Sequence, residues 1–287
     1  SPVTQLVMLA RILQTTQAQM NRVLDVMNYK TDPGLRFEVQ KSVTEAEKLG
    51  GAVRVDSLTF GFDHTADPLL HDMSFEIEPG RAIALVGASG CGKTTIIDLL
   101  LGLEQPWTGE IRLDGTPRDE IDLLAITGSI AGASGSVTAF GASLRNNVTM
   151  WDASIPDEQV VRALQDADCL ELMDRPGGLD MKISEGGRNL SGGQVQRLEI
   201  ARSLVRSPSL LLLDGATSAL DGACEARVLN SIRARGSTMI LVTERASALQ
   251  HVDEVFIVRD GAIADRGRPD ELAGRNDWFR DEFGGGA

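Results

Sequence analysis

One glycine-rich segment limits what this chain can fold into. Residues 87–94 read Gly87-Ala88-Ser89-Gly90-Cys91-Gly92-Lys93-Thr94, preceded by an apolar run at 82–86 and followed by a helical pattern at 93–103. Glycine tolerates backbone conformations in which successive N–H groups point into one concavity, and such a nest at a helix N-terminus binds phosphate. Because strand, loop and helix occur in the order that the motif requires, a chance match among the 30 glycines is the weaker interpretation. We therefore predict an α/β fold with a nucleotide phosphate site.

The residues of this segment have distinct expected roles. Lys93 is expected to reach the β- and γ-phosphates, and the Thr94 hydroxyl to ligate Mg²⁺. Asp214 follows the apolar run 210–213, and a carboxylate at the carboxyl end of a buried strand beside a phosphate loop holds Mg²⁺ through water. The expected phosphate contacts come from Gly87, Ser89, Gly90, Cys91, Gly92, Lys93, Thr94 and Thr95.

The bulk composition argues against several classes of protein. A formal net charge of -13 over 287 residues does not favour the concentrated basic patch that nucleic acid requires, so no nucleic-acid partner is expected. Three cysteines without metal-ligand spacing indicate a reducing, cytoplasmic setting. No apolar run reaches the roughly 18 residues of a membrane span, and no signal peptide is visible. Because the chain begins with Ser1-Pro2 instead of Met, we expect a piece of a longer protein.

Local patterns divide the chain into a helix, a linker and a larger domain. Apolar residues at three- and four-residue steps predict an amphipathic helix over 3–28, ended by Asp32-Pro33-Gly34, and the polar stretch up to residue 50 predicts a linker. Apolar strands that alternate with helices imply a parallel sheet covered on both faces. The expected strands are 53–62, 73–77, 82–86, 110–113, 210–213, 239–243 and 255–258, and the expected helices are 93–103, a helical face at 160–167, 192–206 and 222–235.

Three motifs in a fixed order resemble the nucleotide-binding domains of ABC transporters, specifically of exporters. After the glycine loop come Leu190-Ser191-Gly192-Gly193-Gln194 and then Leu213-Asp214-Gly215-Ala216-Thr217-Ser218-Ala219-Leu220-Asp221. The resemblance covers residues 51–287. It implies a RecA-like P-loop NTPase core with an antiparallel β subdomain and an inserted α-helical subdomain at about residues 136–205. Residues 1–30 resemble the cytoplasmic end of the last transmembrane helix of such an exporter, with 31–50 as the linker.

Smaller details are similar to bacterial peptide and bacteriocin exporters, in particular those serving precursors with nitrile-hydratase-like leaders. They are Trp151-Asp152, Arg175-Pro176-Gly177-Gly178 and Glu185-Gly186-Gly187-Arg188-Asn189. The resemblance implies a transmembrane domain elsewhere in the protein and a location on the cytoplasmic face of a bacterial inner membrane, this fragment itself being soluble.

The resemblance also implies ATP and Mg²⁺ as ligands and a head-to-tail dimer of two such domains with two ATPs between them. Each ATP would meet the glycine loop of one domain and the signature of the other, so Ser191, Gly192, Gly193 and Gln194 would serve the partner's ATP. The alternative for the signature is a helix cap and tight turn that need no ligand. Asp221 matches an inter-domain contact residue of the family, and Glu185 matches the segment that touches the transmembrane coupling helices.

Phe62 falls where exporters place an aromatic ring against adenine. A plain core phenylalanine is the alternative interpretation of this residue.

Three positions depart from the family pattern. Gly215 replaces the glutamate that polarises the attacking water, Glu244 replaces the histidine that contacts the γ-phosphate, and Gly135 aligns with the glutamine that senses γ-phosphate and Mg²⁺. Loss of a general base costs roughly 10²- to 10⁴-fold in rate, which is about 3–5 kcal/mol of barrier. A carboxylate at Glu244 would also repel the γ-phosphate, and its offset from Asp214 disfavours it as a substitute base.

This pattern predicts a domain that binds Mg-ATP with weak hydrolysis of its own and supplies its signature to a competent partner, most simply in a heterodimer. One alternative is a nucleotide-controlled pseudo-ATPase regulatory module, for which the signature would be vestigial. Another is a soluble ABC ATPase of the DNA-repair or translation-factor kind, which the acidic charge and the helix at 3–28 disfavour. The transported substrate is set outside this chain.

Overall fold

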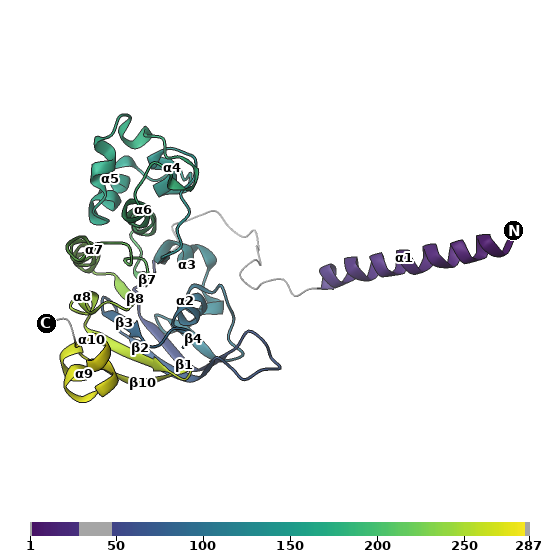
Figure 1. Cartoon of the computed structure of the whole chain (residues 1–287), viewed down its shortest axis with the longest axis horizontal. Helices are drawn as coiled ribbons and strands as arrows, with labels where there is room; N and C mark the ends of the chain where they lie inside the picture. Colours follow the sequence, from purple (N-terminus) through teal and green to yellow (C-terminus); the bar gives the residue numbers. More distant parts are fainter. Residues whose placement is uncertain (1, 29–47, 285–287) are drawn as a thin grey trace. The chain divides into compact units, whose positions relative to one another are not determined.

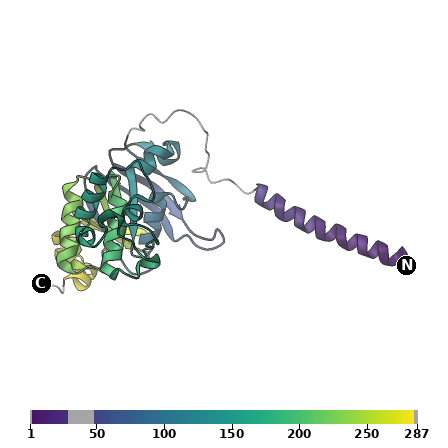
Figure 2. The same cartoon turned by 90° about the horizontal axis from the view of Figure 1, so that it is seen from above.

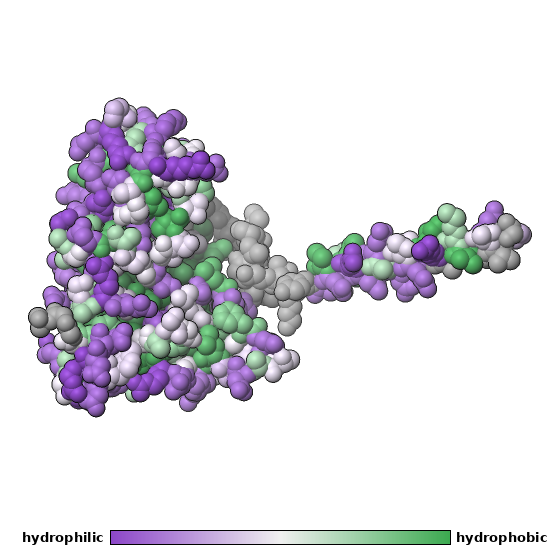
Figure 3. Space-filling view, viewed as in Figure 1, coloured by the Kyte–Doolittle hydropathy of each residue, from purple (hydrophilic) through white to green (hydrophobic). Residues whose placement is uncertain are grey.

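A computed structural model describes residues 2–28 and 48–284, which belong to two units, Ser1–Val43 and Thr44–Ala287. In the first unit, α1 (Pro2–Asn28) is one helix, which confirms the helix predicted at 3–28 (Figure 1). Its apolar side chains at Leu13, Met20 and Val23 are exposed, and both polar and apolar residues lie along the helix surface (Figure 3). None of the helices in the described ranges has the length and apolar content to cross a membrane. The predicted turn at 32–34 and nearly all of the linker lie outside the described residues.

The second unit contains a four-stranded antiparallel sheet in the order β2-β1-β4-β5. Phe60 pairs with Leu70 at the end of the β1–β2 ladder, so the first strand ends two residues before the predicted 62 and the second begins three before the predicted 73. The start of β2 at Leu70 was not predicted because the polar pair His71-Asp72 follows it. Asp72 has a positive φ of 47° where the ladder is irregular. The strands are β1 (Val53–Phe60), β2 (Leu70–Ile77), β4 (Thr108–Leu113) and β5 (Thr116–Pro117).

A six-stranded sheet forms the centre of this unit, in the order β10-β9-β3-β8-β7-β6. The strands from β9 to β6 pair in parallel, which confirms the predicted parallel sheet, whereas β10 pairs antiparallel with β9. Neither β10 nor β6 was predicted, because both carry glycine, alanine or charged residues instead of an apolar run. The strands are β3 (Ala82–Val86), β6 (Ile130–Ser134), β7 (Leu210–Asp214), β8 (Thr238–Val242), β9 (Glu254–Arg259) and β10 (Ala262–Gly267).

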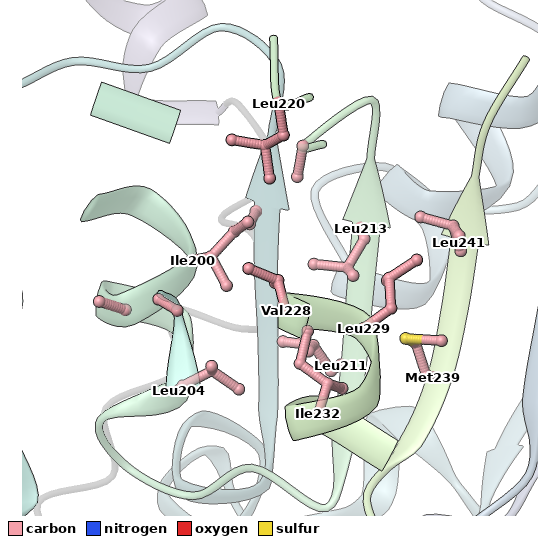
Figure 4. Close-up of a cluster of buried hydrophobic side chains, with 14 of the residues drawn as sticks. Ile200, Leu204, Leu211, Leu213, Leu220, Val228, Leu229, Ile232, Met239 and Leu241 are labelled. Atoms are coloured by element: carbon pink, nitrogen blue, oxygen red, sulfur yellow. The ribbon is translucent and has the colours of Figure 1, made fainter. Parts of the chain in front are cut away.

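The central sheet is buried on both faces. Because successive side chains of a strand point to opposite sides, each buried strand contributes to two apolar clusters. On β7, Leu210 and Leu212 join the apolar cluster that contains α2 (Lys93–Leu101). Leu211 and Leu213 join the other cluster, which includes α6 (Gly192–Leu204) and α7 (Gly222–Ala234) (Figure 4). An unbroken apolar strand is therefore what this position requires.

The helices α4, α5 and α6 lie at one end of the unit, with the antiparallel sheet at the other (Figure 1). Figure 2 shows the same unit from above. Val160, Ala163 and Leu164 are fully buried on α5, as the predicted helical face requires. The predicted helix 93–103 ends earlier, at Leu101, because Gly102 adopts a left-handed cap with φ 76°. The remaining helices include α3 (Leu123–Ser129), α4 (Leu144–Thr149), α5 (Asp157–Asp166), α8 (Ala246–Leu249), α9 (Pro269–Arg275) and α10 (Asp277–Phe283).

Candidate nucleotide-binding site

The parallel register brings four loops to one edge of the central sheet. Asp214 at the end of β7 pairs with Val242 of β8 and with Ser134 of β6, and Val242 pairs with Leu85 of β3. The carboxyl ends of these strands therefore align. The glycine loop, the Asp214-Gly215 turn, Glu244 and Gly135 each follow one of these ends.

The glycine loop has the backbone geometry that phosphate binding needs. Gly90 and Gly92 have positive φ angles of 82° and 102°, and Gly92 caps the start of α2. Lys93 is buried, and its Nζ donates to the carbonyl oxygens of Gly87 and Ala88 at 2.7 and 2.9 Å. The ammonium group is thus held inside the curve of the loop, at the start of α2.

A cavity of about 690 Å³ opens beside this loop. Most of the predicted nucleotide-binding residues line it, together with Asp214, Gly215 and Glu244, whereas Gly135 does not. Gly87 and Cys91 do not line it. Gly87 packs against β9, where a Cβ would lie 2.2 Å from the Val258 carbonyl oxygen, and Cys91 packs against an apolar cluster of the core. The predicted residues that the cavity brings together are Phe62, Ser89, Gly90, Gly92, Lys93, Thr94, Thr95, Asp214, Gly215 and Glu244.

Phe62 lies at the mouth of this cavity with 71% of its surface exposed. This exposure excludes the alternative of a core phenylalanine. Its ring meets Phe60 edge to face at a centroid distance of 5.1 Å, so the side chain is oriented although it is not buried. An exposed, oriented ring beside a phosphate loop is suited to stacking on a nucleobase.

The donors in this cavity fit a magnesium ion. The Thr94 side chain and the Asp214 carboxylate line the same cavity, and Mg²⁺ prefers hard oxygen ligands supplied by one or two side chains and by phosphate. Within the described part of the chain, no group of three or more histidine, cysteine or acidic side chains could hold a metal ion alone. A metal here would therefore depend on the nucleotide for most of its ligands.

The two glycines at altered positions lie against each other. The Gly135 N–H donates to the Asp214 carbonyl oxygen at 2.8 Å, and a Cβ on Gly135 would lie 3.1 Å from the carbonyl oxygen of Gly215. Gly215 has a φ of +62°, and its N–H donates to the Val242 carbonyl oxygen at 3.2 Å. A Cβ on Gly215 would meet no atom within 4 Å. There is space at this point of the site, but neither glycine provides a side chain to fill it.

Among the residues that the structure describes, two acidic and two basic side chains line the cavity. Asp214 and Glu244 line the cavity, facing Lys93 and Arg245. Burial raises the pKa of the neighbouring Asp98 carboxyl, and the charge of Asp214 raises it further. The cavity lining thus supplies cations for an anion and a carboxylate for Mg²⁺.

The signature residues are placed outside this cavity, at the start of α6. The Ser191 hydroxyl accepts a hydrogen bond from the Gln194 N–H, and the Gln194 side chain accepts one from the Ser191 N–H. This capping box confirms the helix cap, and Ser191 and Gly192 are exposed beside it while Gly193 is half-buried. The cap and a ligand contact are compatible, because the helix N-terminus still points outward.

Two further predicted contact residues also lie outside the cavity. Asp221 is exposed and caps α7 by accepting from the Cys224 N–H at 2.9 Å. Glu185 is exposed in a short 3-10 helix, Glu185–Gly187, beside Gly141.

Two functional candidates were missed by the sequence reasoning. Arg245 lines the cavity, and its NH1 donates to the carbonyl oxygens of Leu220 and Thr217 at 2.6 and 3.3 Å. Gln196 is buried on α6 and bonds the segment after β7. The available signals were the charge of Arg245 directly after Glu244 and the position of Gln196 two residues after the signature. The partners of both residues depend on tertiary contacts, which the sequence does not show.

The sequence profile of the ABC transporter family matches residues 70–218, which include the glycine loop, the signature and Asp214. This chain belongs to the ABC transporter family. Among solved structures, a bacterial Atm1-family ABC exporter with ATP bound superimposes with a TM-score of 0.80 and 28% identity, over 96% of this chain and 48% of that one. The two-sheet fold predicted from the resemblance is thereby confirmed, and the chain is an ATP-binding domain of the exporter type.

Curated relatives of this ABC domain include transporters with different named functions. The mycobactin import ATP-binding/permease protein IrtB of Mycolicibacterium thermoresistibile is 36% identical over 92% of this chain and 45% of its own length. An ATP-dependent lipid A-core flippase of Pseudomonas fluorescens is 35% identical, over 84% and 41%. The probable multidrug resistance ABC transporter ATP-binding/permease protein YheI of Bacillus subtilis is 32% identical, over 96% and 47%. The chain thus spans about half the length of these relatives, and their names do not refer to peptides.

Proposed function

We propose that this ABC domain binds Mg-ATP, hydrolyses it slowly, and lends its signature to the ATP site of a second, competent ABC domain. The observation that carries the proposal is Gly215. It lies in a cavity that retains a complete phosphate loop and Asp214, at the position where a catalytic carboxylate is expected, and it has no side chain.

Slow hydrolysis follows from what the cavity lacks. A missing general base costs roughly 10²- to 10⁴-fold in rate. Gly135, adjacent to Gly215, offers no side chain to orient water or metal. Glu244 brings a negative charge into a cavity that must accept a γ-phosphate, which raises the energy of the ATP-bound state.

The exposed start of α6 supports the second half of the proposal. Ser191 and Gly192 present a hydroxyl and a backbone amide at a helix N-terminus that this chain's own cavity does not use. We infer that they serve the ATP of a partner domain, with Asp221 at the interface between the two. A heterodimer is favoured because a homodimer would contain two impaired sites.

The wider assembly is also proposed. A transmembrane domain would occupy the part of the protein that relatives named ATP-binding/permease proteins carry beyond the matched half. Glu185 would then face its coupling helices at the cytoplasmic side of the membrane. The details at 151–152 and 175–178 favour a peptide or bacteriocin cargo, which stays a prediction.

Equilibrium binding of Mg-ATP to the chain, measured by calorimetry, tests the first step. Lys93→Ala should weaken binding by about 10- to 100-fold, because a charged hydrogen bond contributes about 1.5–3 kcal/mol. Lys48→Ala is a matched control, since the Lys48 Nζ also donates to two carbonyl oxygens, those of Arg206 and Ser207, away from the cavity. Equal loss in both variants, or no binding by the wild type, would refute nucleotide binding at this loop.

The second step is tested in the assembly with a competent partner domain. Ser191→Arg should abolish the partner's ATP turnover while this chain still binds Mg-ATP, because the arginine fills the anion site at the helix start. Unchanged partner turnover would favour the regulatory module instead, in which the signature takes no part in hydrolysis.

A further inference from the structure

We propose that Gln196 is a positioning residue that couples the nucleotide cavity of this chain to its signature. The inference rests on the proposed function, since it concerns how ATP bound in the cavity reaches the signature offered to a partner. It starts from the segment 215–220, which follows β7 and has contacts on two sides.

One side of this segment belongs to the cavity. Gly215, Thr217 and Ser218 line it together with the phosphate loop. The segment is internally closed, because the Ser218 N–H donates to Gly215 and the Leu220 N–H donates to Thr217, at 3.1 and 3.0 Å. A nucleotide that moves one of these residues therefore moves the whole turn.

The other side of the segment belongs to the signature helix. The Gln196 Oε1 accepts from the Ala219 N–H at 2.7 Å, and its Nε2 donates to the Ser218 hydroxyl at 3.0 Å. Gln196 is 6% exposed, so its amide is buried although its partners Ser218 and Ala219 are exposed. The backbone of Gly193 approaches the same turn closely, since a Cβ there would lie 3.4 Å from the Ala219 carbonyl oxygen.

The buried Gln196 amide connects α6 to the turn through both its oxygen and its nitrogen. Separating α6 from the turn would break both hydrogen bonds and leave the buried Gln196 amide unpaired, so the two move together more readily than apart. On the opposite side, Arg245 holds the turn to the loop that carries Glu244 through the carbonyl oxygens of Leu220 and Thr217. Cavity, turn and signature thereby form one hydrogen-bonded unit, with Gln196 as the link to the signature.

Amide hydrogen exchange of the chain with and without Mg-ATP tests this coupling. In the wild type we expect Mg-ATP to slow exchange both at 216–220 and at 192–195, by about fivefold or more, the lower end of typical site-to-site coupling. Gln196→Met has a similar length but makes neither hydrogen bond. It should keep Mg-ATP affinity and the slowing of exchange at 216–218 and 220, and lose the response at 192–195. The Ala219 N–H is left out of this comparison, because it loses its acceptor in the variant. Should this variant fail to fold, Gln196→Asn, one methylene too short to span both partners, carries the same expectation.

Two further variants separate positioning from general damage to the helix. Gln196→Glu retains an acceptor for the Ala219 N–H and for the Ser218 hydroxyl, so it should restore the response of the signature amides. Ser203→Ala removes an equally buried polar group of α6, whose hydroxyl donates to the Ile200 carbonyl oxygen of the same helix, and should respond as the wild type does.

The outcomes distinguish this inference from the proposal beneath it. Absence of Mg-ATP binding by the wild type would remove the proposed function and the inference together. Binding without any change at 192–195 in the wild type, or an undiminished change in Gln196→Met, would overturn the inference and leave the proposed function standing.

Discussion

Restoring a carboxylate at residue 215 is the most direct perturbation of this site. Gly215→Glu places a candidate general base in a position where an added Cβ meets no atom within 4 Å, so steric conflict at the Cβ does not oppose it. The backbone does oppose it, because Gly215 has a φ of +62° and L-residues pay for left-handed conformations. The expected outcome is faster hydrolysis in a less stable protein.

The two magnitudes can be compared. A left-handed L-residue costs roughly 1–2 kcal/mol. For a domain of this size that lowers the melting temperature by about 2–4 °C per kcal/mol. A positioned general base is worth roughly 10²- to 10⁴-fold in rate. Because Gly135 and Glu244 remain unfavourable, we expect the lower end, about 100-fold.

Single-turnover hydrolysis, with the chain in excess over Mg-ATP, measures this directly. Gly215→Gln is the matched control, since it carries the same backbone strain and nearly the same volume without a base. It should melt at the same lowered temperature as Gly215→Glu and hydrolyse no faster than the wild type.

Two results would refute the reasoning. Rapid phosphate release from the wild type would mean that another group positions the water, and Glu244 would be examined next. Equal acceleration by Gly215→Gln would mean that backbone conformation, and not a carboxylate, limits the reaction.

Two stability predictions concern charges around the cavity. Burial raises the folded-state pKa of the Asp98 carboxyl, and the charge of Asp214 raises it further. The contribution of this group to stability is therefore full below the unfolded pKa near 3.8 and is lost as pH rises through the folded pKa. Without Mg-ATP, Asp98→Asn should melt above the wild type at pH 7 and lose that advantage in thermal scans below pH 4. Arg245→Ala should cost about 1–3 kcal/mol in urea unfolding, because it leaves the buried Glu225 carboxylate without its cation. Adding Glu225→Gln should recover part of that loss, and an additive cycle would show that the pair does not interact.

Much of the architecture could be predicted from local patterns. The fully apolar strands β3, β7 and β8 were predicted because a strand buried on both faces needs no alternation, and their order with helices indicated a parallel sheet. The strand β6 was not predicted because most residues of Ile130–Ser134 are small and show no apolar pattern. Small residues are compatible with its position at the edge of the sheet. Likewise, β10 was not predicted because alanine, glycine and charged residues make up most of its sequence. It lies at the other edge of the sheet, where it pairs with β9.

The candidate site was predictable where chemistry is local to the sequence. The phosphate loop is one contiguous segment, so spacing alone identified Lys93 and Thr94. Gln196 and Arg245 could not be assigned, because each acts on the turn after β7 across more than 20 residues of chain. The alternative roles of Phe62 were separated by its exposure, which depends on how the loop after β1 leaves the sheet.

The three positions that depart from the expected family pattern lie outside both apolar cores. Gly135 and Glu244 are exposed, and the Cβ position of Gly215 faces open space, so substitution there leaves both apolar cores intact. The phosphate loop is different, because a Cβ at Gly87 would lie 2.2 Å from the Val258 carbonyl oxygen and one at Gly92 would lie 2.5 Å from the Leu70 side chain. Side chains at these two loop positions therefore conflict with the fold, whereas substitution at Gly215 or Glu244 disturbs neither apolar core. This asymmetry supports the proposal that the domain binds ATP and presents a signature while it hydrolyses ATP slowly.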